Sequence, residues 1–117
     1  NVRAYMEFFE EACWQFYAML GFTASRLRSG EVHLAAVQQN ISYQKELYPG
    51  DTIMVRTEVI DMREKVLRFR HELLNTESGE ICATCEFTVV CLDPKGRKSQ
   101  PFPAGVAQRA AELALEA

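Results

Sequence analysis

The side chains best suited to metal or redox chemistry are four cysteines and two histidines, and their spacing does not bring them together. Cys82 and Cys85 form a C-x-x-C pair within an apolar run that alternates like a β-strand. In a strand, a spacing of three puts the two thiols on opposite faces of the sheet. His33 and His71 have no partner at a spacing typical of zinc ligands. We therefore expect no metal and no organic cofactor, and cysteines that remain thiols indicate a reducing, cytoplasmic compartment.

Carboxylates are the second group that could do chemistry, and three of them share one predicted helix. Residues 2–20 place apolar side chains at helical spacing, with Glu7 and Glu11 on the polar side. Glu10 falls nearer the apolar arc, where partial burial would suit a general base. For each glutamate the alternative is a solvated or ion-paired surface residue. Asn1 suits the N-cap of this helix, beside amides that have no partner within it.

Length and composition limit the classes of protein that these residues can serve. The chain has 117 residues, 48% of them hydrophobic, with a net charge of −3. This is too apolar for a disordered chain and is the size of one domain, residues 1–117. A pI near 5.4 gives no basic face for a nucleic acid. No apolar run approaches the length that a membrane span needs, so we expect neither nucleic acid nor membrane as a partner.

The hydrophobic pattern changes period once along the chain, from helical to alternating. The aromatic residues of the first helix widen its apolar arc until little of it could face water, so we expect it to be buried nearly all round, with Gly21 ending it. Strands follow at residues 32–43, 53–59, 66–74 and 81–92, and a short helix runs from Pro103 to near Ala117. The order predicts an α+β fold in which the helix lies on an antiparallel sheet. An exposed sheet edge would pair with a second copy of the chain.

Several segments, in this order, carry a resemblance to a known family. They are residues 1–6 (NVRAYM), 9–14 (FEEACW), 20–22 (LGF), Tyr43 with 47–53 (LYPGDTI), 79–83 (GEICA) and 101–103 (PFP). Together they resemble the hot-dog fold acyl-CoA thioesterases, in the hydroxybenzoyl-CoA thioesterase-like branch. The resemblance implies a long central helix wrapped by an antiparallel sheet, with a short C-terminal helix. It also implies one further strand from a segment preceding Asn1, which we expect to exist.

The chemistry that the resemblance implies is hydrolysis of an acyl-CoA or acyl-carrier thioester to free acid and thiol, at a dimer interface. Backbone amides at the start of the central helix would polarise the thioester carbonyl. In this branch the catalytic carboxylate precedes the central helix, so we expect the main one upstream of Asn1. The resemblance implies two sets of site residues: catalytic Asn1, Glu10 and Glu11, and substrate-binding Tyr5, Phe9, Gln38 and Tyr43.

Two other functions stay open on the same fold. One is a non-catalytic binding or regulatory module that takes acyl-CoA and has no working base. The other is a hydratase or dehydratase, which is less favoured because neither His33 nor His71 lies near the start of the helix. In each case we expect a homo-oligomer, either a homodimer or a homotetramer built as a dimer of dimers.

Overall fold

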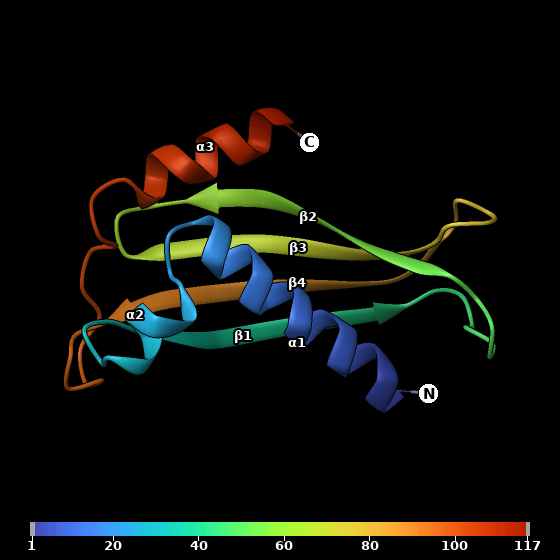
Figure 1. The fold of residues 1–117 in the computed structure, drawn as a ribbon, viewed down its shortest axis with the longest axis horizontal. Coiled ribbons are helices and arrows are strands. Elements are labelled where there is room, and N and C mark those ends of the chain that lie inside the picture. The colour runs from blue at the N-terminus through green and yellow to red at the C-terminus, as the bar shows by residue number, and fades with distance from the viewer. Residues whose placement is uncertain (1, 117) are drawn as a thin grey trace.

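The computed structural model describes residues 2–116, and the side chains of residues 4–114 within them. A long helix comes first, then a short helix, four strands and a C-terminal helix (Figure 1). Their bounds are α1 Val2–Met19, α2 Ala24–Arg28, β1 His33–Tyr43, β2 Ile53–Met62, β3 Val66–Asn75, β4 Ile81–Leu92 and α3 Val106–Glu116. The predicted α+β class and the order of its elements are confirmed.

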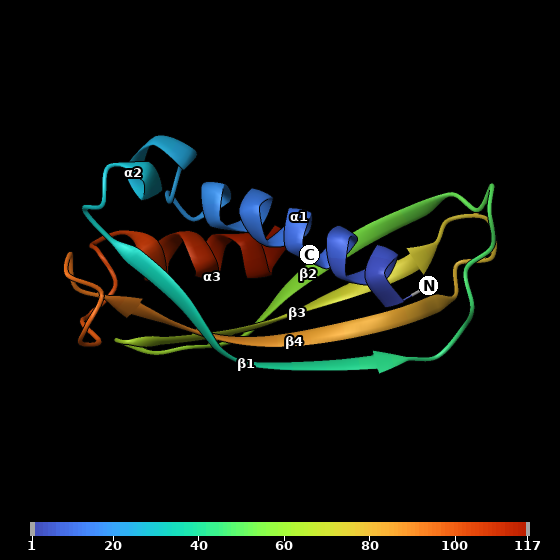
Figure 2. The same ribbon diagram turned by 90° about the horizontal axis from the view of Figure 1, so that it is seen from below.

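The four strands form one antiparallel sheet in the order β1-β4-β3-β2. Helix α1 crosses one face of this sheet, and α3 lies on the same side, along β2 (Figures 1 and 2). The described sheet therefore has β1 at one edge and β2 at the other. The arrangement of a long helix on a bent antiparallel sheet is the hot-dog architecture that the resemblance implied.

The carboxyl end of α1 is fixed by a glycine. Gly21 has a φ of 108°, a left-handed conformation that other residues rarely adopt. The amide of Phe22 donates to the carbonyl of Tyr17 at 2.8 Å, and that of Gly21 donates to Ala18 at 3.0 Å. This pair of bonds is the Schellman motif, and the buried Phe22 ring supplies its apolar contact. The predicted stop at Gly21 is confirmed.

The expectation that α1 is buried nearly all round is wrong. Phe9, Phe16 and Leu20 are buried, but Trp14 is 58% exposed and Met19 is 48% exposed. A single sheet covers only one side of a helix, so the remaining apolar side chains face outward. The outer side of α1 is therefore exposed in the described chain. It carries the large apolar side chain of Trp14, which a partner could cover.

Aromatic rings at the centre of the sheet hold α1 in place. Phe69 of β3 is fully buried and lies 4.7 Å from Phe16 and 5.3 Å from Phe87, measured between ring centroids. Tyr17 meets the same Phe69 ring edge-on at 6.0 Å. Aromatic contacts of this kind add to the free energy gained from burying their area. Phe69 is thus the residue through which helix and sheet share one core.

Three local differences from the predicted elements have physical causes. Helix α2 was not predicted, because five residues are too few for a periodic signal; Thr23 caps it by accepting a hydrogen bond from the amide of Arg26. Helix α3 begins at Val106 rather than Pro103, after Gly105 with a φ of 92°. The pairing of β1 with β4 shifts between Ala36 and Gln38, which leaves Val37 unpaired in a bulge.

Truncating the buried Phe69 side chain should destabilise the chain more than truncating an exposed side chain. We expect Phe69→Ala to lower the free energy of unfolding by about 3–5 kcal/mol, because it leaves a cavity that four rings border. The control is Met54→Ala on β2, where the side chain is 50% exposed and the cost should stay below about 1 kcal/mol. Urea denaturation of both variants measures the difference, and equal losses would contradict this account of the core.

Candidate active site

A small cleft opens at the amino end of α1, where the helix faces the loop between β1 and β2. We call it the N-terminal cleft, and its volume is about 250 Å³. Most of its walls are apolar. It is lined by Ala4, Tyr5 and Phe8 of α1, by Leu47, Tyr48, Pro49 and Asp51 of the loop, and by Ile53 of β2. A ligand in this cleft would lie beside the first turn of the helix.

Tyr5 ties the first turns of α1 to the loop. Its hydroxyl donates to the carbonyl of Lys45 at 3.0 Å. Its ring meets that of Tyr43 edge-on, with 5.1 Å between centroids. The loop itself is held to the sheet because the amides of Gln44 and Lys45 both donate to the carbonyl of Cys82. These contacts set the width of the N-terminal cleft.

The turn at the far side of the cleft is built by Asp51. The amide of Tyr48 donates to a carboxylate oxygen of Asp51 at 2.8 Å, and the amide of Asp51 donates back to the carbonyl of Tyr48. Gly50 between them has a φ of 93°. The Tyr48 hydroxyl donates to Glu46, and this bond raises the pKa of Tyr48. The carboxylate of Asp51 is therefore engaged in shaping the loop.

The electrostatics of the N-terminal cleft follow from the direction of α1. The first turn of a helix ends in backbone N–H groups that have no partner within the helix, and the aligned peptide dipoles make that end positive. The amino end of α1 lies at this cleft, so the positive end of the helix dipole faces a bound ligand. Oxygen atoms that gain negative charge during a reaction are stabilised at such a position.

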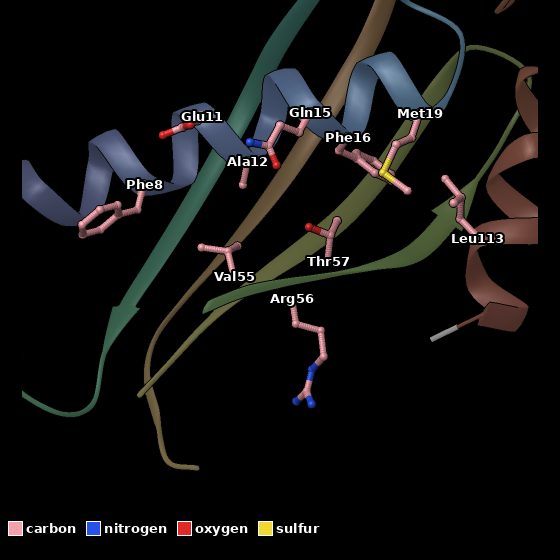
Figure 3. A pocket seen from close by; sticks show the side chains of 10 residues that line it. All are labelled: Phe8, Glu11, Ala12, Gln15, Phe16, Met19, Val55, Arg56, Thr57 and Leu113. Carbon is pink, nitrogen blue, oxygen red and sulfur yellow. The ribbon is translucent and has the colours of Figure 1, made fainter. Parts of the chain in front are cut away.

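A second depression, which we call the lateral groove, runs between α1 and β2 with a volume of about 460 Å³ (Figure 3). Phe8 lines both this groove and the N-terminal cleft, so the two adjoin. Val55 and Thr57 of β2 point toward α1, whereas Arg56 between them points to the other side of the sheet. Met19 and Leu113 close the end that lies nearest α3.

His71 lies buried beneath the middle of α1. Its spacing in the sequence had indicated no catalytic or metal-binding role. His71 of β3 is completely buried, with its ring parallel to that of Phe9 at 6.1 Å. Its Nδ1 lies 2.7 Å from Oγ1 of Thr57, and its Nε2 lies 3.3 Å from Sγ of Cys13. Burial lowers the pKa of His71 to about 4, so the ring is neutral at pH 7. The signal in the sequence is its position, because residues 69, 71 and 73 of β3 alternate inward.

The thiol and the phenol next to this histidine also keep their protons. Burial, with a smaller contribution from the charge of Cys85, raises the pKa of Cys13 to about 12. Burial is also the largest cause of the raised pKa of Tyr17. The four cysteines are all buried free thiols. Among the described side chains no group of three or more potential metal ligands comes together.

The structure brings together only some of the predicted site residues. Tyr5 lines the N-terminal cleft and packs against Tyr43, while Phe9 is fully buried against His71. The bulge at Val37 turns Gln38 to the face of the sheet away from α1, opposite Thr88. The remaining three candidates lie elsewhere: Glu10 is exposed, Glu11 is exposed at the lateral groove, and Asn1 lies outside the described residues.

The lowered pKa of His71 predicts a specific dependence of stability on pH. The unfolded chain binds a proton at this residue near pH 6.5, whereas the folded chain does so only near pH 4. The contribution of His71 to stability is therefore complete above pH 6.5 and is lost as the pH falls toward 4, up to about 3 kcal/mol. His71→Phe should remove this slope from urea midpoints measured across that range, and His33→Asn should retain it. A slope that is the same in His71→Phe and the unchanged chain would contradict the assignment.

Two solved CoA thioesterases and one protein solved with CoA share the fold of this chain. The gentisyl-coenzyme A thioesterase BH1999 is 22% identical, with a TM-score of 0.79 over 95% of this chain and 85% of that one. The protein SAV2348 from Staphylococcus aureus, solved in complex with CoA, is 21% identical, with a TM-score of 0.90 over 98% of this chain and 72% of that one. Slr0204 from Synechocystis, a 1,4-dihydroxy-2-naphthoyl-CoA thioesterase, is 18% identical, with a TM-score of 0.84 over 97% and 83%.

Comparison of the sequence with family models shows the family to which the chain belongs. No curated protein matches the chain. Within the described residues, no helix has the length and apolar character needed to cross a membrane. The model of one protein family, the thioesterase-like superfamily, matches residues 1–110. That match spans nearly the whole chain and agrees with the hot-dog architecture, and the chain therefore belongs to the thioesterase-like superfamily.

Proposed function

We propose that the protein hydrolyses an acyl-CoA thioester to free acid and CoA thiol at the amino end of α1. The observation that carries the proposal is the N-terminal cleft, in which apolar walls adjoin the first turn of a helix. An acyl group needs the apolar walls, and the carbonyl of a thioester needs donors for its oxygen. Membership of the thioesterase-like superfamily supports the same activity.

The reaction requires three contributions from the site. A base removes a proton from water as the water oxygen attacks the thioester carbon, and the carbonyl oxygen becomes negative in the tetrahedral intermediate. Backbone amides at the start of α1, near Asn1, stabilise that oxygen, aided by the dipole of the helix. The C–S bond then breaks, and the thiolate leaves with its electron pair and takes up a proton. A carboxylate suffices as the base because a thiolate is a good leaving group.

The site is completed, in our proposal, by a second copy of the chain. Glu10 and Glu11 are exposed on α1 and do not line the N-terminal cleft of their own subunit. A carboxylate on this outward arc can act only on a substrate that a neighbouring subunit holds against it. The outer edge of β1 carries no strand among the described residues, and Val37 on it is 60% exposed, which supports pairing of two copies there.

The walls around the substrate follow from the same geometry. We assign the ring of Tyr5, which lines the N-terminal cleft, to contact with the acyl group, and Tyr43 packs edge-on against that ring. Phe9 is fully buried and supports the helix from behind, and Gln38 is available only to a partner that covers the outer face of the sheet. The four free thiols favour a reducing, cytoplasmic setting.

A second candidate function is an acyl-CoA-binding module without turnover. It is favoured by the engagement of Asp51, the carboxylate that lines the described N-terminal cleft, with the amide of Tyr48. A hydratase is disfavoured by the histidines. His33 lies 2.9 Å from the carbonyl of Pro94, in the loop after β4, and His71 is enclosed in the core.

The activity is tested by the release of free thiol from acyl-CoA. We expect turnover with at least one member of a panel of short, long and aromatic acyl-CoA thioesters, followed with a chromogenic thiol reagent. Isothermal titration with a non-hydrolysable acyl-CoA is done on the same preparation. Binding without turnover would establish the binding module. The absence of both binding and turnover across the panel would contradict both functions.

The role of the exposed carboxylates is tested by removing their charge one at a time. Glu10→Gln and Glu11→Gln are compared with Glu7→Gln, which removes a matched charge from the same exposed side of α1. We expect the variant that loses the base to lose about 10²-fold or more in kcat, as is usual for a general base, with the free energy of unfolding unchanged. Retention of kcat in all three would show that the base is neither Glu10 nor Glu11.

A further inference from the structure

The buried ring of His71 forms a bridge between α1 and β2. His71 lies on β3 directly opposite Thr57 of β2, and its Nδ1 lies 2.7 Å from Oγ1 of that threonine. Its Nε2 lies 3.3 Å from Sγ of Cys13, which belongs to α1. A neutral imidazole has one donor and one acceptor, and a thiol or a hydroxyl can take either role. Both bonds can therefore form whichever ring nitrogen carries the proton.

The two elements that this bridge joins also form walls of both depressions. Ile53 of β2 lines the N-terminal cleft together with Tyr5 of α1. Thr57, farther along β2, lines the lateral groove together with Ala12 of α1 (Figure 3). The distance that the bridge through His71 spans therefore helps to set how far apart these walls stand.

The inner face of α1 connects the bridge to the amino end of the helix. Tyr5, Phe9 and Cys13 follow one another at a spacing of four, so they lie along one line of the helix, and all three are buried. Phe9 lies parallel to the ring of His71 at 6.1 Å. Cys13 is two turns from Tyr5, about 12 Å along the helix axis. A shift or tilt of α1 at His71 would therefore move its first turns relative to the loop to which Tyr5 donates.

Ring packing alone does not explain a histidine at this position. The rings of Phe69 and Phe87 meet that of His71 at 5.2 and 5.5 Å between centroids, so a phenylalanine would have similar neighbours. An imidazole in such a core costs free energy unless both nitrogens are paired. What it adds is two bonds whose length and angle are restricted.

We propose that His71 is a positioning residue for the hydrolysis, whose two hydrogen bonds hold α1 where the amides of its first turn meet the thioester carbonyl. The proposal rests on the proposed thioesterase function, and it places His71 away from the reacting atoms. Donors that stabilise a transition state lose much of their effect when they are displaced by about 1 Å. Loss of the bridge should therefore lower kcat and leave KM little changed.

The kinetic test removes the bond at Cys13 and then restores it. We expect Cys13→Ala to lower kcat for the best acyl-CoA of the panel by roughly tenfold, with KM little changed. Cys13→Ser still offers a hydrogen bond to Nε2 of His71 and should keep most of kcat. Cys91→Ala removes another buried thiol, on β4, and should leave kcat unchanged. Full kcat in Cys13→Ala, or equal losses in all three variants, would overturn the proposal.

A double-mutant cycle tests whether the loss passes through His71. His71→Phe keeps an aromatic ring in the core and removes both bonds, so we expect it to lower kcat at least as much as Cys13→Ala. Adding Cys13→Ala to His71→Phe should then lower kcat no further, because the bond is already absent. Losses that multiply in the double variant would overturn the proposal.

A second measurement is independent of turnover. In ¹H–¹⁵N correlation spectra, the backbone amides of residues 4–8 and 44–51 should shift in Cys13→Ala and return toward their original positions in Cys13→Ser. Amides of these two segments that stay in place in Cys13→Ala would overturn the proposal. If the unchanged protein hydrolyses no acyl-CoA, the proposed function fails, whereas the placement of α1 by His71 is still decided by these spectra.

Discussion

The structure depends on the packing of one face of α1 against the middle of the sheet. Phe69 is the centre of this contact, and the rings of Phe16 and Tyr17 on α1 close over it. Tyr5 holds the amino end through the carbonyl of Lys45, and the Gly21 turn ends the helix. Because the helix is fixed at its middle and at both ends, its first turn is held at the wall of the N-terminal cleft. The packing of the core therefore determines how the first turn of α1 is placed relative to a substrate in the cleft.

The same contact explains why a histidine can lie in this core. A buried polar group is costly unless its hydrogen bonds are satisfied, and His71 has a partner for each ring nitrogen, one on α1 and one on β2. The bonds also depend on direction, so they fix the position of α1 along the sheet more narrowly than ring packing does. A core made only of the surrounding phenylalanines would tolerate small shifts of the helix.

The sequence predicted the elements well, because both periods are strong in this chain. The strand at β4 alternates buried and half-buried residues along most of its length, and α1 ends at Gly21 as predicted. It could not predict which arc of α1 stays exposed, since that depends on how much of the helix one sheet can cover. It also missed the bulge at Val37, and one unpaired residue reverses the face of Gln38. The partners of His71 come from positions 14 and 58 residues away in the chain, a distance over which periodicity carries no information.

The distribution of charge over the sheet limits where a second copy can bind. On the face away from α1, Arg70 pairs with Glu58 and with Glu86, and Arg56 pairs with Glu72 at 2.8 Å. These ion pairs engage most of the charged groups on that face, although Nε of Arg70 is buried without a hydrogen-bond partner among the described residues. The exposed apolar side chains of Trp14 and Val37 instead lie on α1 and on the edge strand β1. A partner that covers them would lie next to Glu10. Association there would bury the exposed apolar side chains, and it would also bring a second subunit to the surface where our proposed mechanism needs one.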